Sequence, residues 1–231
     1  MKSQAMILFV SLMAASLSQG AAPKTVFDYY KLLAAAEKVD AVLLQQGKDW
    51  KYVQAIDGEE VSSIAAPIVD VRNGYLHAEY GLSACDKKVL EVALFTAAGN
   101  KRFVAVGFHD GCMEAMRAGL SFYEFKGEAF SDALAASGDL SGVKFCSFFE
   151  EKKQAEADAV EEAVQLEYAL PRQGLTVVVR PIVQREPNTG VDQTLGPKAE
   201  ALASRSQKFQ ALELTWSSKD ARFTFSAKKP R

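Results

Sequence analysis

The sequence places a histidine, an aspartate and a cysteine together in His109-Asp110-Gly111-Cys112, directly after the apolar segment 103–108. Polar side chains at a strand end have a rigid base and stay accessible, which is a common setting for functional sites. A free Cys112 thiolate could act as a nucleophile, with His109 as its base and a third group to orient the imidazole. Catalytic partners usually converge from separate elements, so we favour the competing interpretation, a turn without catalysis.

The same residue types can bind metal ions. His77, His109 and Asp110, with Cys85 as a further candidate, are competent ligands. The sequence has only two histidines, and it contains neither a histidine pair at helical spacing nor a close pair of cysteines. We therefore expect no metal and no cofactor.

The three cysteines, Cys85, Cys112 and Cys146, allow one disulfide and one free thiol in an oxidising compartment. All three pairings remain open, because disulfide geometry depends on distances that a sequence does not contain. We favour Cys85–Cys112, which closes the shorter loop by a small margin and would remove Cys112 from catalysis.

The sequence lacks the motifs of several other common classes of enzyme and binding site. The sequence contains no G-x-S-x-G nucleophile turn and no glycine-rich phosphate loop. The acidic segment 150–162 lacks the alternating ligand spacing of a calcium loop, so a solvated face is the better interpretation. Aromatic side chains can also line a binding cleft, although most should belong to the core. These candidates are Tyr29, Tyr30, Trp50, Tyr52, Tyr75, Tyr80, Phe122, Tyr123 and Trp216.

The N-terminus has the organisation of a secretory signal peptide over residues 1–20. Lys2 precedes an uncharged apolar run at 5–17, and small residues follow it. The run is shorter than the roughly 20 residues of a membrane-spanning helix. We expect cleavage before Ala21, with a site after Ala22 as the alternative, and a periplasmic or secreted mature protein.

Charge excludes some partners. Loss of residues 1–20, whose only charged side chain is Lys2, changes the formal net charge from −2 to −3. A nearly neutral chain has no long-range field to attract DNA, RNA or anionic lipid. We expect no nucleic-acid partner and no stable membrane insertion after the signal is removed.

The elements that must position these residues begin with a helix. Apolar residues at intervals of three and four predict a helix capped by Thr25 that continues through Leu44 to near Gly47, with a break around Glu37. This prediction makes residues 21–66 an N-terminal helical segment, and residues 67–231 an antiparallel β-rich region.

From residue 67 the hydrophobic period changes to two. Asn73-Gly74 between alternating segments predicts a hairpin with a two-residue type I′ turn. In this register Asp70 faces His77 on an exposed face, as a weakly coupled titrating pair. The predicted buried face contains Val69, Val71, Leu76, Ala78 and Tyr80.

Further strands follow along the chain. The nearly continuous apolar segments 89–95 and 103–108 predict central strands covered on both faces. Segment 150–162 is either a helix or a solvated connection. The other predicted elements are strands at 120–126, 163–170, 175–183, 211–216 and 222–227, a loop at 184–196 and a helix at 198–207.

Together these patterns predict an α+β fold: an N-terminal helix packed on a twisted, mainly antiparallel sheet of successive hairpins, either undivided or split into two sheets near 150–162. Because the ingredients of catalysis are few, we expect a non-enzymatic exported protein that binds a small ligand or an envelope protein. The alternatives are a hydrolase or transferase that uses Cys112 and His109, and a structural envelope component that makes contact through the loop 184–196.

Overall fold

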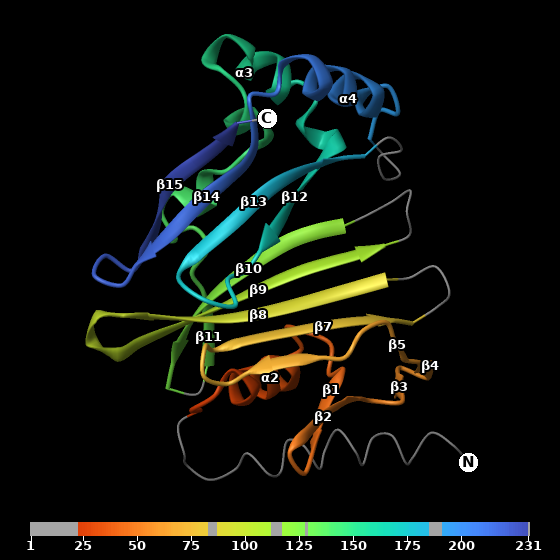
Figure 1. Ribbon diagram of the computed structural model, residues 1–231, viewed down its shortest axis with the longest axis vertical. Helices are drawn as coiled ribbons and strands as arrows, with labels where there is room; N and C mark the ends of the chain where they lie inside the picture. The colour runs from red at the N-terminus through yellow and green to blue at the C-terminus, as the bar shows by residue number, and fades with distance from the viewer. Residues whose placement is uncertain (1–22, 83–86, 112–116, 128, 185–190, 231) are drawn as a thin grey trace.

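Two large antiparallel sheets form the framework of the protein, in a computed structural model that describes residues 23–82, 87–111, 117–127, 129–184 and 191–230 (Figure 1). The signal segment 1–20, Cys85 and Cys112 lie outside these residues. The predicted α+β class and the antiparallel pairing are confirmed.

The larger sheet has seven strands in the order β11-β10-β9-β8-β7-β5, with β6 also paired to β7. Its central hairpin joins β8 to β9 through the short helix η1 (Ala98–Asn100), as the two apolar segments predict. Its strands are β5 (Ser62–Ser63), β6 (Ile68–Asp70), β7 (Tyr75–Gly81), β8 (Lys87–Ala97), β9 (Lys101–Gly111), β10 (Arg117–Lys126) and β11 (Ala129–Asp132).

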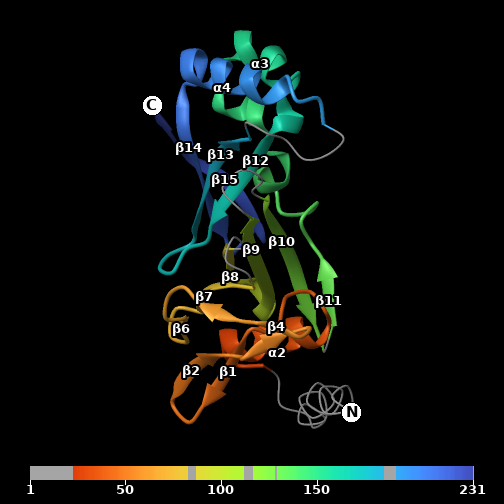
Figure 2. The same cartoon turned by 90° about the vertical axis from the view of Figure 1, so that its right-hand side faces the viewer.

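The smaller sheet has the order β12-β13-β14-β15. Its strands are β12 (Val164–Ala169), β13 (Thr176–Val183), β14 (Phe209–Ser217) and β15 (Arg222–Pro230), close to the predicted ranges. Figure 2 shows the helices α3 (Glu151–Asp158) and α4 (Leu195–Ser206) at one end of the molecule and α2 (Val26–Ala35) at the other. The connection before β12 contains η2 (Asp139–Gly142), η3 (Phe145–Phe148), α3 and η4 (Glu161–Ala163).

The N-terminal helix α2 is shorter than the sequence predicts. Thr25 caps it as expected, since its hydroxyl accepts from the Asp28 amide while the Asp28 carboxylate accepts from the Thr25 amide. The helix ends at Ala35, and Glu37 adopts a left-handed φ of 53°. Leu44 therefore lies in a strand, and the segment 21–66 is only partly helical. Its short strands are β1 (Leu43–Gln46), β2 (Asp49–Tyr52), β3 (Ala55–Ile56), β4 (Glu59–Glu60) and β5.

The register of the first hairpin also differs from the prediction. Asp70 pairs with Tyr75 and not with His77, so the turn contains four residues. The Asp70 carboxylate accepts hydrogen bonds from the backbone and side-chain amides of Asn73, which closes this longer turn. Val71 consequently lies in the turn and is 47% exposed, although the two-residue turn placed it on the buried face.

Each face of the larger sheet contributes to a separate core. On one face, Leu76, Val92 and Val106 are buried together with side chains of α2, including Tyr30 and Leu33. The opposite face packs against the smaller sheet. That core contains an aromatic group in which Trp216 contacts four rings, Phe95, Phe103, Phe122 and Phe223. The faces are called here the helix-side face and the inter-sheet face.

Candidate functional site

The residues of the predicted catalytic group lie on opposite faces of β9. Side chains alternate along a strand, so His109 points to the inter-sheet face and Asp110 to the helix-side face. Asp110 acts electrostatically on Tyr80, which is buried on the helix-side face. Asp110 is therefore not placed to orient the His109 imidazole. Cys112, the predicted nucleophile, lies outside the described residues.

His77 instead belongs to a polar cluster on the inter-sheet face. Its Nε2 lies 3.1 Å from Glu79 Oε1, and its Nδ1 lies 3.4 Å from Glu91 Oε1. The Tyr75 hydroxyl donates to the same Glu91 oxygen. The side chains of His77, Glu79 and Glu91 are 19%, 25% and 15% exposed, so most of the cluster is shielded from water. These four residues are called the His77 cluster.

The two carboxylates change how His77 titrates. The hydrogen bond to Glu91, and then the one to Glu79, raises the pKa of His77 against the opposing effect of burial. Lys87, whose Nζ lies 3.1 Å from Glu79 Oε2, lowers the pKa of Glu79. Burial and the Glu91 carboxylate raise the pKa of the Tyr75 hydroxyl. The cluster therefore favours a protonated His77 between two carboxylates.

Glu91 also connects the two sheets. Its Oε2 accepts a hydrogen bond of 2.9 Å from the backbone amide of Leu170, at the end of β12. Next to it, Gly107 allows close approach, because a Cβ there would lie 3.2 Å from the Tyr168 carbonyl oxygen. Glu91 therefore acts as a hydrogen-bond acceptor that holds the two sheets together.

The predicted Asp70–His77 pair is not formed, because the register of the hairpin differs. Asp70 accepts from Asn73 and from Arg172 Nε, which lies 3.1 Å away in the turn between β12 and β13. These two hydrogen bonds lower the pKa of Asp70. Asp70 thus provides a second contact between the sheets.

The predicted metal ligands are not assembled among the described residues. His77 and His109 share a face but lie on β7 and β9, separated by β8, and their rows differ by two residues, so their backbones are about 12 Å apart. Asp110 points to the other face. Within the described part of the chain, no group of three or more His, Cys, Asp or Glu side chains is arranged to hold a metal ion.

A different feature lies on the helix-side face, near the end of β9. Phe108 is 42% exposed, although its neighbours on either side in the sheet are the buried Leu90 and the half-buried Gly119. A Cβ at Gly119 would lie 2.5 Å from the Phe108 ring, so the ring lies directly on the glycine backbone. Figure 1 shows this end of β9 extending beyond α2.

Charged residues border the exposed ring. Lys88, Asp110 and Arg117 form the next row across β8, β9 and β10 on the same face. Lys88 Nζ lies 3.7 Å from Asp40 Oδ2, and Arg117 is exposed. Phe108, Gly119 and these three charged residues are called the Phe108 surface. An aromatic ring beside mixed charges is suited to contact with a ligand or partner.

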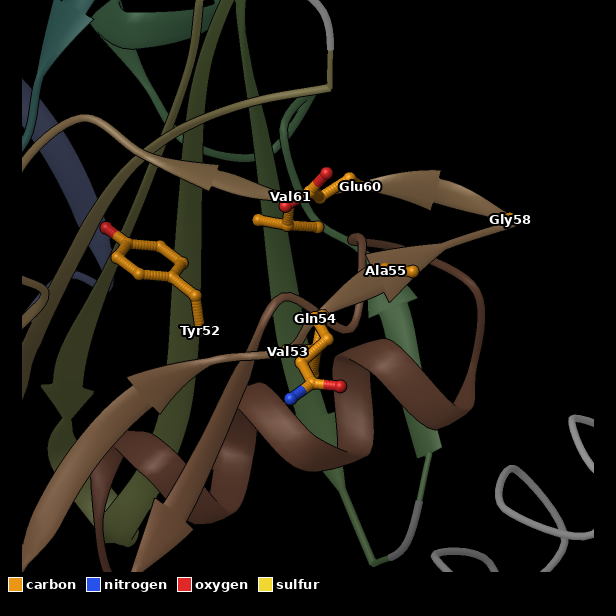
Figure 3. A pocket seen from close by; sticks show the side chains of 7 residues that line it. All are labelled: Tyr52, Val53, Gln54, Ala55, Gly58, Glu60 and Val61. Atoms are coloured by element: carbon orange, nitrogen blue, oxygen red, sulfur yellow. The ribbon is translucent and has the colours of Figure 1, made fainter.

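The described chain also contains a cavity of about 570 Å³ beside β2, β3 and β4 (Figure 3). Tyr52, Gln54 and Glu60 contribute polar groups to its lining. The Tyr52 hydroxyl already accepts a hydrogen bond from the Glu79 amide at 2.9 Å. The cavity opens broadly to solvent and contains no assembled set of reactive groups.

The sequence reasoning missed several residues of these sites, and Glu91 and Phe108 are the central ones. Glu91 is a single charged residue in an otherwise apolar strand segment, and this pattern could have indicated a buried, paired carboxylate. Phe108 has no such signal, because the apolar segment 103–108 predicts burial of all its residues. Among the predicted aromatic candidates, Phe122 and Trp216 are core residues.

Comparisons with known proteins provide no functional name, so function has to be inferred from the side chains of this protein. No family model matches the sequence, and no curated protein matches it. Among solved structures, the fold is similar to a domain of an uncharacterized protein from Porphyromonas gingivalis W83, with a TM-score of 0.45 and 11% identity. The alignment covers 74% of this chain and 81% of that chain.

Proposed function

We propose that this is an exported, periplasmic or secreted protein that binds a small ligand or an envelope protein through the Phe108 surface, without catalysis. The observation that carries the proposal is the 42% exposure of Phe108 near the end of a central strand. The ring lies on Gly119 and beside three charged side chains, and an exposed aromatic ring with such a polar border favours a contact role.

The arrangement of the polar residues supports a non-enzymatic role. The side chains of the His77 cluster bond to one another, to Lys87 and to the Leu170 amide, so these groups stabilise the junction between the sheets. His109 and Asp110 point to opposite faces of β9. Neither arrangement supplies a nucleophile with an oriented base.

A Cys85–Cys112 disulfide is part of the proposal. Lys87 and Gly111, the described residues nearest to these cysteines, are cross-strand partners. Cys85 precedes Lys87 by two residues and Cys112 follows Gly111 directly, so short connections to paired positions support this pairing. A disulfide there would exclude Cys112 as a nucleophile.

The N-terminal helix is proposed as a permanent layer of the fold. Its support is the burial of Val26, Phe27 and Leu33 in one core with strand residues. None of the helices in the described ranges has the length and apolar character needed to cross a bilayer. The proposed export signal is the segment 1–20, and the intact mass of the native protein should correspond to a chain that begins at Ala21.

The binding experiment compares two exposed phenylalanines. Mature wild type, Phe108→Ala and Phe225→Ala serve as baits for the envelope fraction of the native source, and native mass spectrometry detects bound small molecules. Phe225 is the matched control, because it is also 42% exposed but lies on β15. A component retained by wild type and Phe225→Ala, and reduced about tenfold by Phe108→Ala, supports the proposal. Equal retention by all three proteins contradicts it.

A further inference from the structure

The turn between β12 and β13 is held against the larger sheet at two polar points. At one, Glu91 Oε2 accepts from the Leu170 amide at 2.9 Å. At the other, Arg172 Nε donates to Asp70 Oδ2 at 3.1 Å. The first point is shielded, since Glu91 is 15% exposed, whereas the Arg172 side chain is 56% exposed. The Glu91 contact is therefore the less screened of the two.

Only the first point contains a histidine. Charged and titratable groups approach His77 from each neighbouring element. On its own strand these are Tyr75 and Glu79, and on β8 they are Glu91 and Lys87, which pairs with Glu79. The wider surroundings contribute Asp70 on β6, His109 on β9, Tyr168 on β12 and Arg172 in the turn.

Two carboxylates therefore face one imidazole, and one of them is also the acceptor for the smaller sheet. A protonated His77 compensates the charge of Glu91 and donates to both carboxylates. A neutral imidazole donates from one nitrogen only. It no longer balances the negative charge of the shielded Glu91, which lies beside the second carboxylate, Glu79. Burial makes such a loss of compensation costly.

We propose that the His77 cluster is a pH-sensitive latch between the two sheets, in which protonated His77 strengthens the grip of Glu91 on the Leu170 amide. Loss of the proton weakens this contact and frees the turn between β12 and β13 to open locally. The latch is closed in mildly acidic solution and loosens in mildly alkaline solution.

The two histidines of the sequence make the test specific. Hydrogen exchange of the Leu170 amide is measured by NMR from pH 5.5 to 8.5 on the mature protein, and each rate is converted to a protection factor that removes the intrinsic pH dependence. His77→Gln removes the proposed titrating group, and His109→Gln removes the other histidine on the same face. The Ala133 amide, which donates to the Phe122 oxygen at 2.8 Å, reports on the larger sheet away from the latch.

The proposal predicts that protection of Leu170 falls several-fold as pH rises in wild type and in His109→Gln. In His77→Gln, protection of Leu170 should be independent of pH, and protection of Ala133 should be unchanged in all three proteins. A pH dependence that persists in His77→Gln, or that disappears in His109→Gln, overturns the proposal. A parallel loss of Ala133 protection also overturns it, because the opening would then be global.

Discussion

The Glu91 carboxylate accepts a hydrogen bond from the Leu170 amide across 2.9 Å, although 79 positions separate the two residues in the chain. Glu91 projects from the middle of the larger sheet, and Leu170 directly follows β12, the edge strand of the smaller sheet. The same carboxylate binds the Tyr75 hydroxyl and lies beside His77. The Glu91 side chain therefore belongs to the His77 cluster and also connects the two sheets.

Removal of Glu91 should destabilise the protein. Glu91→Ala leaves the Leu170 amide without its acceptor and leaves His77 with one carboxylate, so we expect a loss of about 2–4 kcal/mol in the free energy of unfolding. Glu167→Ala is the control, because Glu167 is 37% exposed and lies 3.9 Å from Arg180. It should cost less than about 1 kcal/mol. Equal losses in urea titrations of the two variants would be inconsistent with a structural role of Glu91.

The free energy of unfolding should decrease both at higher and at lower pH than an intermediate maximum. The pKa of His77 is raised above its ordinary 6.5, so its contribution is complete below pH 6.5 and is lost as the pH rises through the folded-state pKa. The pKa of Glu79 is lowered below its ordinary 4.5, so its contribution is present above pH 4.5 and is lost as the pH falls through the folded-state pKa. These groups place maximum stability between about pH 4.5 and 6.5.

Guanidinium titrations across pH 4 to 9 measure this dependence. His77→Gln should remove the decline above pH 6.5, whereas His109→Gln should keep it. A wild-type free energy of unfolding that increases from pH 6.5 to 8.5 would reverse the expected sign.

Gly138 should be sensitive to substitution. It has a φ of 74° and a ψ of −136°, and a Cβ there would lie 2.5 Å from the Phe223 carbonyl oxygen. Gly138→Ala should cost about 2–4 kcal/mol, because it strains the backbone and displaces the segment that pairs with β15. Gly142 has open space around its Cα, so Gly142→Ala is the control and should change thermal stability little. Similar melting temperatures for the two variants would contradict this explanation.

The thiols give a further prediction. With Cys85 and Cys112 paired, the native protein should contain one free thiol, Cys146. Burial, followed by a hydrogen bond to Asp158, raises the pKa of Cys146 to about 11. Its reaction with a disulfide reagent at pH 8 should therefore be slow until the protein is denatured. A rapid reaction that labels Cys112 in the native protein would support the thiol-enzyme alternative instead.

Sequence patterns predicted the strands better than their exact registers. The hairpin of β8 and β9 follows from two long apolar segments around a turn. In the first hairpin, Asn73-Gly74 predicts a two-residue turn, but only Gly74 has a positive φ, and the Asp70 carboxylate closes a turn of four residues. A side-chain hydrogen bond decided the register, and the turn motif alone contains no information about it.

The end of α2 shows the same limit. Apolar spacing continues beyond Ala35. However, the Tyr30 hydroxyl accepts from the Leu43 amide and donates to the Asp40 backbone carbonyl oxygen, and these hydrogen bonds hold the chain near Leu43 in an extended conformation. The exposed Phe108 was equally inaccessible to sequence reasoning. Its exposure depends on which elements cover this end of the helix-side face, and a local apolar pattern does not specify them.

Binding at the Phe108 surface is the central claim of this account, and site-specific photocrosslinking in the producing cells tests it most directly. A photoreactive phenylalanine analogue replaces either Phe108 or Phe225, which are equally exposed on different sheets. We predict one discrete adduct from position 108, lost when Arg117→Ala is added, and none of that mass from position 225. Adducts of the same mass and yield from both positions, or none from position 108, would contradict the claim.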